Sequence, residues 1–280
     1  MNWKQVVVAA CGIMGACSAA NADIKYTTEM TMEGVGDAMP KTVTLRAVKP
    51  NFERSEMRQT IGTFQMNHVT IRECGKKQTI KIDPSLKIYT IVADGESGSD
   101  EVAPDGKPKP KPKGEPKTGH VAMNYKVQDL GEEEVAGFKT RHYMIDTEMT
   151  STGCAGNGTT KMKQEIWVSD IRDANPCPAD SSTTTMADAM SRTDCKITVE
   201  TKGDFDRFNE IYKGLILRQK TYNDGKVMMT TEVTMLSQAK FEDDTLFTVP
   251  ADYKQVSDKE FQSAQTQAMM KAMMGGAMPF

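Results

Sequence analysis

Two segments of this chain alternate polar and apolar side chains with a period of two, which is the pattern of a β-strand that buries one face. The residues that share a face in these segments are Ile24, Tyr26, Thr28, Met30 and Met32, then Val227, Met229, Thr231, Val233 and Met235. The turn 223–225, Asn-Asp-Gly, stands before the second segment and is typical of a β-hairpin. Leucine is scarce, and β-branched residues and methionine fill the apolar positions, which favours a sheet. The sequence therefore predicts a mainly β protein made of consecutive antiparallel strands.

Two segments have helical spacing instead. A helix over 204–213 is indicated by Phe205, Phe208 and Ile211, and Gly214 would end it. A capping box of Ser257 and Glu260 predicts a second helix over 257–274, within a Met-rich C-terminal part, 257–280. One stripe of that helix carries mostly small residues, namely Phe261, Ala264, Ala268 and Ala272. Small side chains bury little area, at about 25 cal/mol per Å², so we expect a loosely attached helix whose end is free to meet a membrane or a partner.

The first 22 residues have the layout of a secretory signal peptide. After a short positive start, an apolar run covers 6–16, and small residues up to Ala22 mark a cleavage site before Asp23. The run is too short to remain as a membrane-spanning helix. The sequence therefore predicts an exported protein, periplasmic or secreted. Residues 14–17 also resemble a lipobox, and in that alternative the protein is a lipoprotein anchored at Cys17.

The cysteines that follow the signal peptide are Cys74, Cys154, Cys177 and Cys195. An even number of cysteines in an exported chain predicts two disulfides, for which three pairings are possible. Cys177 and Cys195 flank a short polar segment and are the easiest pair to close. We therefore expect a Cys177–Cys195 disulfide and, by elimination, a Cys74–Cys154 disulfide.

A composition shift interrupts the strands over 93–120. The segment lacks an apolar cluster and contains an arm of alternating lysine and proline over 107–113. Such a sequence cannot bury enough apolar surface to fold, so we expect a disordered or extended insertion. The basic arm could contact anionic lipid headgroups or another part of the envelope. The alternative is a solvated loop between two strands.

Catalytic signals are missing from the sequence. It contains no nucleophile elbow, phosphate-binding loop or dinucleotide fingerprint. The three histidines, His68, His120 and His142, are not spaced as metal ligands, and His142 fits a residue on a sheet face. The net formal charge of −3 disfavours nucleic-acid binding, which requires clustered Lys and Arg. We therefore expect no enzyme activity, no cofactor, no metal site and no nucleic-acid partner.

Three segments, 76–89, 131–143 and 246–253, together resemble an uncharacterised bacterial envelope family that is grouped structurally with the outer-membrane lipoprotein carriers LolA and LolB. The resemblance covers most of 23–256. It implies one strongly curved antiparallel sheet, an incomplete barrel, whose concave side is covered by a few helices. In the carriers that cavity holds acyl chains. A similar ligand for this chain is implied by analogy of fold alone.

Three hypotheses for the function follow. The first is an exported, non-enzymatic protein that binds a lipid, an acyl chain or a lipoprotein in a cavity of the curved sheet. Its expected lining consists of residues on the apolar faces of long strands: Met30, Met66, Ile166, Leu217, Met229, Val233 and Met235. The second is a structural or interaction protein of the envelope without a ligand. The third, suggested by 21 methionines, is periplasmic copper binding through thioethers.

Overall fold

The computed structural model describes residues 23–33, 41–61, 64–93, 117–172, 187, 190, 195–241 and 244–275. These residues form one 13-stranded sheet. Its strands are β1 (Ile24–Met32), β2 (Thr42–Lys49), β3 (Phe52–Ile61), β4 (Phe64–Glu73), β5 (Gln78–Asp83), β6 (Ile88–Ala93), β7 (Lys117–Val135), β8 (Phe138–Gly153), β9 (Gly158–Ser169), β10 (Cys195–Gly203), β11 (Ile216–Asn223), β12 (Lys226–Gln238) and β13 (Lys254–Gln255). The helices are the 3₁₀ turns η2 (Cys74–Lys76) and η3 (Asp244–Phe247), and the α-helices α2 (Phe205–Ile211) and α3 (Asp258–Gly275).

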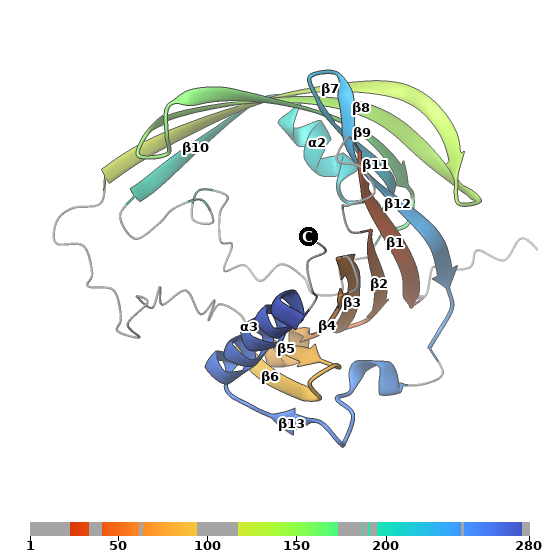
Figure 1. Cartoon of the computed structure of the whole chain (residues 1–280). Coiled ribbons are helices and arrows are strands. Elements are labelled where there is room, and N and C mark those ends of the chain that lie inside the picture. Colours follow the sequence, from red (N-terminus) through yellow and green to blue (C-terminus); the bar gives the residue numbers. More distant parts are fainter. Residues whose placement is uncertain are drawn as a thin grey trace, which may run out of the picture.

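The sheet has the order β10-β7-β8-β9-β11-β12-β1-β2-β3-β4-β5-β6-β13. Neighbouring strands are antiparallel except at the two edges, where β10 lies parallel to β7 and β13 parallel to β6. Figure 1 shows the sheet as an open arch, with α2 and α3 on its inner side. The expectation of a mainly β fold with one curved, unclosed sheet is therefore confirmed.

Part of the sheet is bent by local irregularities in strand pairing. Register shifts interrupt four strand pairings, at Thr27/Thr28, Asp129/Gly131, Ile216/Arg218 and Thr221/Tyr222. An extra residue on one strand of a pair bends that strand and increases its twist. All four shifts lie in the part of the sheet from β7 to β1.

The helix α2 covers the inner side of the β7–β9 part of the arch. Its Ile211 packs into a cluster with Val127, Ile145, Ile166 and Val168, all buried. Asp204, directly before the helix, accepts a hydrogen bond from the Val127 backbone N–H at 2.9 Å. Because two aromatic rings of the helix also pack against Tyr125 in tilted contacts, the helical spacing in the sequence corresponds to a real packing face.

The C-terminal chain passes around the free edge of the sheet. Phe247 of η3 packs on one face of β4 and β5, against Val69, Ile71, Ile80 and Ile82. Strand β13 then pairs with β6 at the edge, and α3 contacts the residues that alternate with this cluster on the other face. The two faces of β4 and β5 are thus covered by two consecutive parts of the same C-terminal segment.

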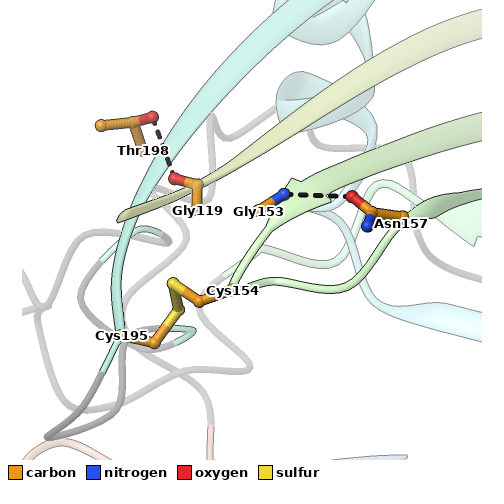
Figure 2. The surroundings of a disulfide bond; sticks show 6 residues. All are labelled: Gly119, Gly153, Cys154, Asn157, Cys195 and Thr198. Atoms are coloured by element: carbon orange, nitrogen blue, oxygen red, sulfur yellow. Dashed lines mark hydrogen bonds between the residues drawn. A yellow bond between two sulfur atoms is a disulfide. The ribbon is translucent and has the colours of Figure 1, made fainter. Parts of the chain in front are cut away.

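The disulfide pairing differs from the prediction. Cys195 bonds to Cys154 across 41 residues of sequence, so the expected Cys177–Cys195 and Cys74–Cys154 pairs are both wrong (Figure 2). Strand β10 pairs with β7 so that Cys195 lies opposite Lys117, and the Cys154 backbone N–H donates to the Thr118 carbonyl. Both cysteines are therefore brought together by β7. Cys74 is also disulfide-bonded.

Several predictions fall on residues that the structure does not describe. The signal peptide 1–22, the lipobox with Cys17, Cys177, the Lys-Pro arm and the last residues of the C-terminal part are among them. The expected insertion 93–120 is shorter at both ends, because Ala93 belongs to β6 and β7 begins at Lys117. Asp23, the first described residue, is buried and accepts a hydrogen bond from the Phe241 backbone N–H.

Candidate functional site

A groove of about 460 Å³ separates α3 from the ends of β4 and β5. This volume lies within the range of small-molecule sites, about 300–1,000 Å³. Its apolar lining comes from three elements: Met66 of β4, Leu86 of the β5–β6 turn, and Ala268 and Met269 of α3. The groove therefore combines one rigid wall, the sheet, with one helical wall.

Local sequence determines where the helical wall begins. The Ser257 backbone N–H donates to Glu260 Oε2 at 2.9 Å, and the Glu260 backbone N–H donates to Ser257 Oγ at 3.3 Å. This is the capping box that the sequence predicts. The hydrogen bonds from Ser257 lower the pKa of Glu260 below its ordinary value of 4.5. The helix starts at Asp258 and runs to Gly275, so its predicted bounds are correct to within one residue.

The helix docks through a narrow stripe. Phe261 is 4% exposed, whereas Ala264, Gln265 and Ala268 are half-buried. Lys81 of β5 pairs with Asp258 at 3.1 Å between Nζ and Oδ1. The stripe has the narrow width expected from the sequence, but a buried aromatic ring and an ion pair attach it to the sheet.

Polar side chains of the sheet meet α3 beneath the groove. The Gln265 amide nitrogen lies 2.9 Å from His68 Nδ1 and donates to Asp83 Oδ2 at 3.1 Å. Asp83 is 7% exposed, and its Oδ1 accepts the backbone N–H groups of Ser85 and Leu86. Three N–H donors thus surround this buried carboxylate, as burial of a charged group requires.

The residues expected to line a cavity are distributed over the arch rather than gathered in one place. Met66 alone lines the groove beside α3. Ile166 belongs to the cluster beneath α2, and Leu217 and Val233 to a second buried cluster. Met30 and Met229 lie on adjacent strands, since Met30 is paired with Thr231 and Met32 with Met229. Met235 is 61% exposed.

Other groove residues had no sequence signal of their own. His68 and Asp83 stand in ordinary strand sequence, and Leu86 lies in a turn. Their proximity to Gln265 depends on where α3 docks on the sheet. Gln265 is more than 180 residues away from His68 and Asp83 in the sequence. The helical spacing of Gln265 between Phe261 and Met269 was the one available clue.

A second hollow, of about 510 Å³, lies over β2, β3 and the start of β4. Lys41 and Arg58 line it, and both are paired with acids, Lys41 with Glu29 and Arg58 with Glu56. This hollow is more polar than the groove beside α3, and it contains fewer of the flexible apolar side chains that suit an acyl chain.

His142 lies on the sheet at a distance from the groove, as a residue of a sheet face. Its ring stacks on Trp167 with 4.0 Å between centroids, and its Nδ1 lies 3.1 Å from Glu133 Oε1. Trp167 Nε1 donates to Glu133 Oε2 at 2.7 Å. Hydrogen bonds from Trp167 and the neighbouring His142 lower the pKa of Glu133. Arg218 lies over the same indole ring, at 5.4 Å from its centroid.

Among the described residues, no group of three or more His, Cys, Asp and Glu side chains could hold a metal ion. In the same part of the chain, no helix combines the length and apolar character needed to cross a bilayer.

No family model and no curated protein matches this chain. Among solved structures, it is similar to an uncharacterized conserved protein from Thermus thermophilus, with a TM-score of 0.40 and 9% identity over 85% of this chain and 91% of that one. It is also similar to MucB, with a TM-score of 0.36 and 11% identity over 83% of this chain and 58% of that one. For MucB in complex with MucA(peri), the TM-score is 0.37 and the identity is 11%, over 84% of this chain and 57% of that one. The chain thus spans less than two thirds of the MucB chains.

Proposed function

We propose that this chain is an exported, non-enzymatic binding protein of the envelope that holds the apolar chain of a lipid, an acylated molecule or a lipoprotein in the groove beside α3. The observation that carries the proposal is the groove itself: about 460 Å³ between a sheet and a helix, with Met66, Leu86 and Met269 around it. Methionine side chains are flexible and polarizable, so they adapt to apolar ligands of irregular shape. The predicted signal peptide supports the exported location.

The way α3 is attached also supports ligand entry. Within the described residues, three features attach the helix to the sheet: the buried ring of Phe261, the ion pair of Asp258 with Lys81, and the hydrogen bonds of Gln265. The buried apolar area of such a stripe is small, and its contribution to stability scales with that area. A small displacement of this wall therefore costs less than opening a strand of the sheet.

The test measures displacement of a fluorescent acyl probe by unlabelled lipid. Ala268 is half-buried and lines the groove, so Ala268→Trp should fill it and weaken probe binding. Gln267→Trp, one residue earlier on the exposed side of α3, is the matched control and should bind normally. Equal probe binding by both variants would show that the groove is not the site.

The rival hypothesis is an interaction protein of the envelope without a ligand. It predicts that the wild-type protein binds no probe and that lipid extraction of protein from its native envelope yields no lipid in stoichiometric amount. Copper binding through methionine stays a prediction of the sequence, and metal analysis of the same native material tests it.

A further inference from the structure

The polar lining of the groove beside α3 has a definite hydrogen-bonding character, which is fixed by carboxylates behind it. The Gln265 amide nitrogen donates to Asp83 Oδ2 at 3.1 Å. The Gln262 amide nitrogen, one turn earlier, donates to Asp258 Oδ2 at 2.7 Å. An ionised carboxylate only accepts hydrogen bonds, so each amide must turn its nitrogen toward its carboxylate and keep its oxygen on the other side.

The two amide oxygens are therefore free acceptors. Gln262 and Gln265 both line the groove. Their Oε1 atoms accept no hydrogen bond from any residue that the structure describes. The nitrogen of Gln265 lies 2.9 Å from His68 Nδ1, so Nδ1 is the acceptor and the proton of the neutral imidazole is on Nε2. The groove thus offers two acceptors on α3, together with the amide and hydroxyl groups of Gln65, Asn67, Ser85 and Thr266, which also line it.

The lining of the groove disfavours an anionic head group. The neighbouring hollow, which shares Gln65, Met66 and Asn67 with the groove, contains Lys41 and Arg58, but both cations are paired with acids. None of the described residues that line the groove is a lysine or an arginine. The one charged group in the lining is the Asp83 carboxylate, which already accepts three N–H groups. A bound carboxylate or phosphate would meet the two glutamine oxygens and Asp83 without a compensating cation, and an unpaired charge is costly away from water. Asp83 is 7% exposed and accepts the Gln265 amide, so a cationic head group would have to displace that amide to reach the carboxylate.

From these contacts we infer that the ligand of the groove is a single-chain amphiphile with an uncharged head group that donates hydrogen bonds, a hydroxyl or a primary amide. Its hydroxyl or N–H groups donate to Gln262 Oε1 and Gln265 Oε1, and its oxygen accepts from His68 Nε2. Its chain lies against Met66, Leu86 and Met269. This inference rests on the proposed function, since it names the ligand class of the same groove.

The experiment compares four competitors of one chain length against a fluorescent acyl probe: a monoacylglycerol, a primary fatty amide, a fatty acid and a fatty amine. We expect the monoacylglycerol and the amide to displace the probe at concentrations at least about tenfold lower than the fatty acid and the amine, a factor that corresponds to about 1.4 kcal/mol. Preference between the first two identifies a glycerol-type lipid or an N-acylated amine as the source.

Two variants locate the selectivity. Gln262→Lys replaces a free acceptor by a cation and should improve displacement by the fatty acid. Gln267→Lys adds the same charge on the exposed side of α3, outside the groove lining, and should leave the order of the four competitors unchanged. The Gln267→Lys protein also shows whether added charge alone attracts the anionic ligand.

The possible failures are distinct. If the probe binds and the fatty acid displaces it as well as the monoacylglycerol does, the head-group inference is wrong and the apolar groove stands. If Gln262→Lys leaves the order of the four competitors unchanged, α3 does not recognise the head group. If the wild-type protein binds no probe, the proposed function fails together with this inference.

Discussion

The Gln265 side-chain nitrogen on α3 lies 2.9 Å from Nδ1 of His68 on β4, across 197 residues of sequence. The same nitrogen donates to Asp83 on β5. The C-terminal helix is therefore attached to a polar part of the sheet, on the opposite face from the apolar cluster that contains Ile71 and Ile82. This attachment makes one wall of the groove and determines which polar groups the groove presents.

Removal of the ring of Phe261 should destabilise the docking of α3. Among the described side chains of the helix, Phe261 is the one that is buried, with 4% exposure. Burial of a phenylalanine side chain contributes about 1.5–3 kcal/mol. We expect Phe261→Ala to lower the free energy of unfolding by about that amount, measured by urea denaturation. Met270→Ala, at a position that is 54% exposed, should have little effect. An unchanged stability of Phe261→Ala would mean that the helix is as loosely attached as its stripe of small residues suggests.

The Cys154–Cys195 disulfide should stabilise the edge of the sheet at β10. A loop closed across 41 residues corresponds to about 4 kcal/mol on the chain-entropy relation. We expect the double variant Cys154→Ser, Cys195→Ser to lose stability on this scale, with β10 exchanging its amide hydrogens first. Peptide mapping of the unreduced protein should recover Cys154 linked to Cys195. Recovery of Cys195 linked to Cys177 would contradict the topology described here.

Gly203, at the end of β10, permits a close approach to the backbone of β7. Its φ is +70°, and a Cβ at this position would lie 2.2 Å from the Tyr125 carbonyl oxygen. Gly203→Ala should therefore cost more than the roughly 1–2 kcal/mol of the left-handed conformation alone. Gly137→Ala, at φ +80° with no atom within 4 Å of its Cβ, is the control that measures the conformational cost without the contact. Equal losses in both variants would show that the backbone relaxes at Gly203.

Trp167 should report the ionisation of Glu133 in a protein that begins at residue 23. It is the one tryptophan after residue 22, and its Nε1–H donates to the Glu133 carboxylate. Hydrogen bonds from Trp167 and His142 lower the pKa of this carboxyl from 4.5. A group whose pKa is lowered on folding contributes stability above its unfolded pKa and loses it as the pH falls through the folded value. We therefore expect the fluorescence of Trp167 to change in a step centred below pH 4.5.

The control for this titration is provided by the adjacent residue. Glu133→Gln should remove the acidic step, whereas Glu134→Gln, at an exposed neighbouring position, should keep it. A step that persists in Glu133→Gln would assign the change to another acid near the indole, such as Glu165, which lies 3.8 Å from His142 Nε2.

The sequence by itself determined the elements whose signals are local. Period-two alternation predicted β1 and β12, the Asn-Asp-Gly turn predicted the β11–β12 hairpin, and the box of Ser257 and Glu260 predicted the start of α3. Each of these signals depends on residues within a few positions of one another, because backbone conformation responds to nearest neighbours and to the burial of one face. The curved sheet followed from the resemblance of three such segments to an envelope family.

Tertiary structure alone decided which of these elements meet. Of the residues expected to line a cavity, Met66 was the one found at the groove. The positions of the others were decided by contacts between residues about 200 positions apart, such as the pairing of β12 with β1 and the docking of α3 on β4. The same applies to Cys154 and Cys195, which β7 brings together although Cys177 is nearer in sequence. Loop length favours near neighbours by a weak, logarithmic entropy term, and the pairing of whole strands exceeds it.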